Sequence, residues 1–162
     1  DGPEAQAMDQ ALAQLRSDAA ADPQATADQL AVDFADIYLT HALRASPYES
    51  VWRDEDHLVM QGPTFEVRQF YREHGVVVTD RHTMPDDHLA HQLEFIARLL
   101  DQGQAAAAAK FMDAHLMLWL PDFATRVAAR AATPVYALLA LLTLRACQNL
   151  RAQLPAAPAA AA

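Results

Sequence analysis

The stretch PDDHLAHQLEFIARLL, residues 85–100, has the pattern of a capped amphipathic helix and decides the fold class. Proline fits the first helical turn, and the two aspartates after it complement the positive end of the helix dipole. Gly103 is a typical helix stop. The stretch therefore predicts a helix between Pro85 and Gly103. Its apolar stripe recurs every three or four positions, at Leu89, Leu93, Ile96 and Leu100.

Most of the remaining chain shows helical periodicity as well. Alanine, leucine, glutamine and arginine are abundant and only 4 glycines occur, a composition that favours helices. We therefore predict an all-α, single-domain helical bundle over residues 1–154, with a disordered Pro/Ala tail at 155–162. The last helix is apolar nearly all round from 135 to 144 and is expected at the centre. The other helices are predicted over about 4–21, 23–45, 64–74, 104–118 and 121–132.

Two connections interrupt this pattern. Residues 46–63 have prolines at both ends and clustered charges, and loops of this length inside compact domains are usually functional or disordered. Residues 76–84 form the second connection and are expected to act as a hinge. Either connection could let helices exchange between protomers. The expected state is a monomer with a slowly exchanging, domain-swapped dimer.

Charge and composition exclude several classes of partner. Lys+Arg 12 against Asp+Glu 21 gives a net charge of −9, which argues against general nucleic-acid binding and favours a positively charged partner. The longest apolar stretch, 135–144, is too short to span a bilayer, so no stable membrane insertion is expected. A lone cysteine, Cys147, cannot form an internal disulfide. This cysteine usage indicates a reducing compartment, the cytoplasm.

Histidines supply the candidate for catalysis. His88 and His91 are three apart on one face of the predicted helix, beside Asp87, and such a group could bind a metal ion or serve acid–base chemistry. A metal site needs three or four ligands, and no Cys pair or His-Glu-x-x-His pattern completes this one. The structural interpretation is a capped helix start with two surface histidines. The alternative function is a small metal-dependent or acid–base enzyme that uses Asp87, His88 and His91.

Trp52 stands apart from the other aromatic residues, most of which lie at helical spacing and are explained by core packing. A tryptophan in a charged loop either folds back over the core or belongs to a binding surface. The sequence favours neither.

Three stretches carry motifs in a fixed order. Residues 47–52, PYESVW, lead through Leu58 and Met60 to VRQFYREHG at 67–75. PDDH follows at 85–88, and His115-Leu-x-x-Trp-x-Pro-x-Phe begins the third stretch. Together they resemble the TorD/DmsD/NarJ family of redox-enzyme maturation chaperones over about residues 34–150. Met84 departs from the family's Glu-Pro-x-Asp-His hallmark. The family's N-terminal helices match poorly before Phe34, and are either missing from this chain or diverged.

The resemblance implies an all-helical chaperone with no catalysis of its own. Such a protein binds the twin-arginine leader and the apo catalytic subunit of a molybdopterin-dependent oxidoreductase of the DMSO/TMAO-reductase kind, assists cofactor insertion and prevents premature export. No cofactor is expected. The resemblance leaves weak binding of guanine nucleotide open, as in some members of the family, although the sequence has no Gly-rich phosphate loop. The acidic run at 54–56 would attract leader arginines. The residues expected to bind the leader are Trp52, Leu58, Met60, Phe70, Pro85, Asp87, His88 and Trp119.

Overall fold

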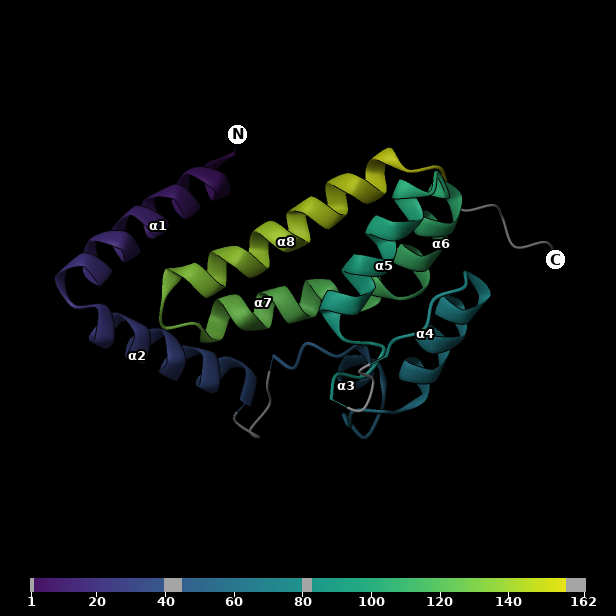
Figure 1. The fold of residues 1–162 in the computed structure, drawn as a ribbon, viewed down its shortest axis with the longest axis horizontal. Helices are drawn as coiled ribbons and strands as arrows, with labels where there is room; N and C mark the ends of the chain where they lie inside the picture. The colour runs from purple at the N-terminus through teal and green to yellow at the C-terminus, as the bar shows by residue number, and fades with distance from the viewer. Residues whose placement is uncertain (1, 40–44, 80–82, 157–162) are drawn as a thin grey trace. The chain divides into compact units, whose positions relative to one another are not determined.

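The computed structural model describes residues 2–39, 45–79 and 83–156, and the regular structure in these ranges is helical throughout (Figure 1). The prediction of an all-α fold is therefore confirmed. In chain order the helices are α1 (Pro3–Ala21), α2 (Pro23–Phe34), the π-helical turn η1 (Ala35–Leu39), α3 (Glu49–Arg53), α4 (Gly62–Glu73), α5 (Leu89–Asp101), α6 (Ala105–Ala114), the 3-10 turn η2 (Leu116–Leu118), α7 (Leu120–Arg130) and α8 (Pro134–Gln153).

Several helix ends follow directly from local sequence. Pro3 and Pro23 open the first turns of α1 and α2, where the missing N–H of proline has no helical partner to lose. The Asp22 carboxylate caps α2 by accepting a hydrogen bond from Ala25 N at 3.0 Å. After α5, Gly103 adopts φ 70°, the left-handed conformation that glycine enters without a side-chain clash. These ends were readable because each depends on one residue type.

The structure corrects the predicted start of α5. The sequence placed Pro85 and Asp87 in its first turn, but the helix begins at Leu89, and His88 is the N-cap residue with an extended backbone. The reason is a pairing between distant segments. Glu49 N donates to Asp87 O at 3.2 Å and Leu89 N donates to Pro47 O at 2.8 Å, so Asp87 is held in a turn ahead of the helix.

The helix α8 is also placed differently from its prediction as a central helix. Its buried residues are Ala140 and Cys147, whereas Leu139 is 53% exposed. An apolar surface on every side does not say which side is covered, and this helix buries small side chains. Burial raises the pKa of the Cys147 thiol to about 11, as expected for a packed and unreactive cysteine.

The chain forms two compact units. One comprises Asp1–Ser46 and Pro121–Cys147, and an aromatic cluster joins its helices: the Phe34 and Tyr38 ring centroids lie 4.9 Å apart, and Tyr38 also contacts Phe123 and Tyr136. A buried carboxylate fastens this unit. Asp33, 2% exposed, accepts hydrogen bonds from Ala132 N at 2.8 Å, Thr133 N at 2.7 Å and the Thr133 hydroxyl. Asp33 therefore ties α2 to the turn before α8.

The second unit comprises Pro47–Leu120 and Gln148–Ala162 and contains most of the sequence motifs. Within it α5 and α6 lie side by side (Figure 1). The rings of Phe70, Tyr71, Phe95 and Phe111 meet in its core, with Phe95 and Tyr71 centroids 4.4 Å apart. The candidate site lies against this aromatic core.

Several sequence predictions fall partly on residues that the structure does not describe. Residues 80–82 of the expected hinge and 157–162 of the expected tail lie outside the described ranges. The domain boundary at residue 154 stays a prediction. In the described helices, no stretch combines the length and apolar character needed to cross a bilayer.

Replacing Asp33 with alanine should destabilise the first unit. The change leaves the buried amide of Thr133 without its acceptor, and a loss of about 2–3 kcal/mol is expected in urea unfolding. Asp28→Ala, on the exposed side of the same helix, is the matched control and should change stability by less than about 0.5 kcal/mol. Equal effects of the two substitutions would contradict the assigned role.

Candidate functional site

The short helix α3 is attached to the start of α5 by main-chain and side-chain hydrogen bonds. Tyr48 and His88 form an isolated antiparallel bridge, and their rings meet edge to face with centroids 4.9 Å apart. Beside the bridge, Asp87 Oδ2 accepts a hydrogen bond from Ser50 N at 2.8 Å and so caps α3. The other carboxylate oxygen, Asp87 Oδ1, is buried and has no hydrogen-bond partner among the described residues. The motifs at 47–52 and 85–88 are therefore one structural feature.

Asp86 connects this feature to α4. Its Oδ2 accepts hydrogen bonds from Arg68 Nη2 at 2.8 Å and Arg68 Nε at 3.1 Å. Its main-chain oxygen accepts a hydrogen bond from the Tyr71 hydroxyl at 3.1 Å. Burial, with the nearby Asp86 carboxylate, raises the pKa of Tyr71 far above its usual value, so the phenol stays a donor. Asp86 thus fixes the turn before α5 against α4.

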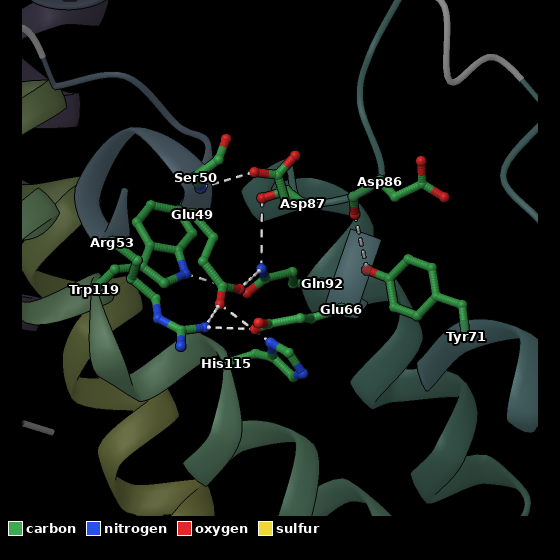
Figure 2. Close-up of polar contacts among 10 residues, drawn as sticks. All are labelled: Glu49, Ser50, Arg53, Glu66, Tyr71, Asp86, Asp87, Gln92, His115 and Trp119. Carbon is green, nitrogen blue, oxygen red and sulfur yellow. Dashed lines mark hydrogen bonds and ion pairs between the residues drawn. The ribbon is translucent and has the colours of Figure 1, made fainter. Parts of the chain in front are cut away.

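Glu49 lies at the centre of a buried polar network (Figure 2). Its Oε2 accepts a hydrogen bond from Gln92 Nε2 at 2.5 Å. Its Oε1 contacts His115 Nδ1 at 3.1 Å and also pairs with Arg53 Nη1. Gln92 Oε1 in turn accepts a hydrogen bond from Trp119 Nε1 at 3.3 Å. A carboxylate that is 0% exposed is thereby surrounded by polar groups from α3, α5 and the chain ahead of η2, and Trp119, which follows η2, joins the network through Gln92.

This network is suited to holding segments in place. The Glu49 carboxylate has its oxygens occupied, and Gln92 and Trp119 carry no titratable group. Glu49, Gln92 and His115 were missed as site residues by the sequence analysis. The signal was present, because Glu49 lies inside the 47–52 motif and His115 opens the third motif.

The structure divides the predicted leader-binding residues into two groups. Trp119 and Asp87 are 0% exposed and Phe70 is 8% exposed, so in this conformation none of the three presents a contact surface. Asp87, which was predicted to bind the leader, accepts a main-chain hydrogen bond within the fold. Trp52, Pro85 and His88 are half-buried. Leu58 and Met60 are exposed, as a contact surface requires.

Four large apolar side chains are exposed in the short segment 58–65, which we call the exposed apolar segment: Leu58 at 56%, Val59 at 45%, Met60 at 40% and Phe65 at 53%. Val59 and Phe65 were not among the predicted site residues. Two residues of this region, His57 and Met60, have positive φ, at 54° and 63°. Non-glycine residues adopt that conformation at some energetic expense, typically at functional sites.

Acidic residues flank the exposed apolar segment on both sides. Asp54, Glu55 and Asp56 precede it, and Glu66 follows it. Contacts within the chain hold the turn that precedes the segment. Asp54 Oδ2 accepts a hydrogen bond from Asp56 N at 3.1 Å, and the His57 ring lies 2.8 Å from Val51 O. The region therefore presents apolar side chains with negative charge at both ends.

His88 and His91 do not form a metal site with their neighbours. The two ring centroids lie 6.2 Å apart, and His88 Nδ1 accepts a hydrogen bond from Ala90 N at 3.1 Å as the cap of α5. Among the residues that the structure describes, no group of three His, Cys, Asp or Glu side chains could hold a metal ion. The geometry gives the metal-dependent alternative no support.

A cleft of about 660 Å³ lies along α5 in the same unit. It is lined by Tyr71 and Phe95, by residues 76–79 and by polar residues of α5 such as Glu94 and Arg98. Its rim carries both signs of charge and so does not itself select a ligand.

Comparisons with known proteins agree with the resemblance in the sequence. The family described as nitrate reductase delta subunit matches residues 1–125. The chaperone protein TorD of Vibrio cholerae is 35% identical over 128 residues, which are 72% of this chain and 58% of that protein. The Tat proofreading chaperone DmsD of Salmonella typhi is 29% identical over 114 residues, 70% of this chain and 56% of that protein.

The two relatives are longer than the part that this chain matches. The chain spans little more than half the length of these two proteins, at 58% and 56%. Both are named as chaperones, which agrees with the prediction that the chain is not an enzyme.

The buried network yields a test of its structural role. In Glu49→Gln the new amide group must face a donor from Gln92, His115 or Arg53, because the native carboxylate accepts from all three. We expect a stability loss of about 2–4 kcal/mol in urea unfolding. Glu55→Gln, in the acidic turn, is the control and should be nearly neutral. If Glu49→Gln leaves the free energy of unfolding unchanged, the network does not contribute to the stability of the fold.

The cap of α5 predicts a pH dependence. Burial first, and then His91, lower the pKa of His88 below its usual 6.5, with Asp87 opposing them. A lowered histidine pKa favours the neutral folded form, so stability is complete above about pH 6.5 and falls as the pH drops through the folded pKa. His88→Asn keeps a good cap and removes the titration. Urea unfolding between about pH 7.5 and 5 should therefore show a smaller loss in His88→Asn than in the parent. Identical losses would contradict the assignment.

Proposed function

The chain belongs to the nitrate reductase delta subunit family, and on that premise we propose that it is a maturation chaperone that binds the twin-arginine leader of a molybdopterin-dependent oxidoreductase. The relatives support the class, since one is named a Tat proofreading chaperone. The observation that carries the proposal is the exposed apolar segment with acidic residues on both sides.

The chemistry of this segment fits a leader peptide. A twin-arginine leader combines paired arginines with an apolar stretch, and its partner must offer an apolar surface near negative charge. Leu58, Val59, Met60 and Phe65 supply that surface, and methionine adapts to side chains of different shape. The acidic residues Asp54, Glu55, Asp56 and Glu66 supply the charge. An apolar peptide face against such a surface is a common recognition mode.

The buried network supports this surface from beneath. Glu49 begins α3, whose last turn carries Trp52 and Arg53 and leads into the acidic residues. Asp86 and Arg68 hold α4, which carries Phe65 and Glu66. In the proposal, Asp87, Phe70 and Trp119 act by positioning these elements, and Trp52, Pro85 and His88 lie at the margin of the contact surface.

The remaining parts of the proposal concern the client. The chaperone would act in the cytoplasm, hold the apo catalytic subunit until its cofactor is inserted, and prevent export before that point. Its expected state is a monomer that exchanges slowly with a domain-swapped dimer. The net charge of −9 suits a basic leader and disfavours nucleic acid.

Leader binding can be measured by titration calorimetry with a synthetic twin-arginine peptide. The double substitution Leu58→Ser and Met60→Ser should weaken binding at least about tenfold, or 1.4 kcal/mol, without lowering the melting temperature, because both side chains are exposed. Leu139→Ser, equally exposed on α8, is the control and should bind like the parent.

Salt provides the second readout. Affinity should fall as ionic strength rises, since exposed charges are screened over about 8–10 Å near physiological salt. If the variant with both Leu58→Ser and Met60→Ser binds the leader with unchanged affinity, the leader does not bind at the exposed apolar segment. Absence of binding to the parent protein would refute the proposed function.

A further inference from the structure

Arg53 places its guanidinium group between two glutamates (Figure 2). On one side its Nη1 pairs with Glu49 Oε1, in the buried network, and on the other it lies 3.5 Å from Glu66 Oε2 on α4. The exposure of the three side chains rises outward: Glu49 is 0% exposed, Arg53 28% and Glu66 58%. The arginine therefore bridges a buried carboxylate to one at the surface.

The two ends of this bridge differ in strength. Glu49 has further donors in Gln92 and His115. Within the described part of the chain, Arg53 is the partner found for the Glu66 carboxylate, and at 3.5 Å this contact is loose. Exposed ion pairs of this kind contribute little, about 0–1 kcal/mol. The outer contact can therefore be exchanged at small cost while Glu49 keeps its other partners.

The bridge also lies at the border of the exposed apolar segment. Glu66 follows Phe65 directly, and α3 and α4 pack against each other. A peptide with apolar side chains on Phe65 and an arginine next to them would bring that arginine to Glu66. The group already held there is itself a guanidinium, which shows that the two carboxylates accept this chemistry.

We infer that Glu49 and Glu66 form a guanidinium-binding site that the chain's own Arg53 occupies in the free protein, and that an arginine of a bound segment takes over from it. That the segment belongs to a leader peptide rests on the proposed function. Arg53 makes both contacts through Nη1, and a guanidinium carries further N–H donors on a long planar group, whereas a lysine ammonium is a compact, strongly hydrated point charge. We therefore expect the site to prefer arginine to lysine.

There is a physical reason for Arg53 to occupy the site in the free protein. A buried carboxylate that loses its cation destabilises the fold strongly, so Glu49 requires a cation whether or not a partner is present. Exchange of one guanidinium for another keeps the charge of the site constant. A partner segment without arginine gains nothing from the exchange, so Arg53 works as an internal competitor that raises the threshold for binding.

Chemical rescue tests the site without any leader. Arg53→Ala removes the internal guanidinium and should lower the melting temperature. Millimolar methylguanidinium should then raise the melting temperature of Arg53→Ala by several degrees while leaving the parent unchanged. Arg72→Ala, which removes an exposed arginine of α4, is the control and should not respond. An equal response of both variants, or of neither, would overturn the inference.

A second variant covers the case in which Arg53→Ala does not fold. Arg53→Lys keeps a positive charge for Glu49 and should compete less well for the site than the native guanidinium. It should bind a twin-arginine leader roughly threefold more tightly than the parent, within the range of a partly exposed ion pair. The gain should vanish when the leader arginines are replaced by lysines.

The outcomes separate the two claims. A parent protein that ignores the leader refutes the proposed function, and the methylguanidinium response still decides the site. A parent protein that binds the leader, together with an Arg53→Lys variant that binds it no better, refutes the self-occupied site alone.

Discussion

The second unit depends on one buried negative charge. Glu49 is fully covered, and Gln92, His115 and Arg53 must all reach it for that burial to be tolerated. Each of these groups comes from a different part of the sequence. The need to supply hydrogen bonds to one carboxylate therefore fixes the positions of α3, α5 and the chain ahead of η2 with respect to each other. The position of the exposed apolar segment depends on these elements.

Local chemistry made much of the fold readable in advance. Pro23 and Gly103 mark helix ends through properties of single residues, and the apolar stripe from Leu89 to Leu100 identified α5. The start of that helix was misplaced because the pairing of Leu89 with Pro47 is a long-range contact. For α8, an apolar surface on all sides hid the fact that Leu139 faces outward.

The candidate site shows the same division. Leu58 and Met60, predicted to bind the leader, are exposed because both stand in a charged loop, outside the helical stripes that form the core. Asp87 and Trp119 were predicted to bind the leader, and the structure gives both a place inside the fold: one caps α3 and the other donates to Gln92 in the core. A motif identifies important residues but does not say whether they contact a partner or hold other residues in place. That distinction depends on burial, which only the packed chain reveals.

The backbone at Met60 has a consequence for how this surface could have arisen. A left-handed backbone at a non-glycine residue is disfavoured by about 1–3 kcal/mol, and glycine at the same place would remove that burden. Natural sequences rarely sit at their stability optimum, and sites that serve a task are where stability is most often given up. Met60 therefore places an exposed apolar side chain at a position where stability alone favours glycine.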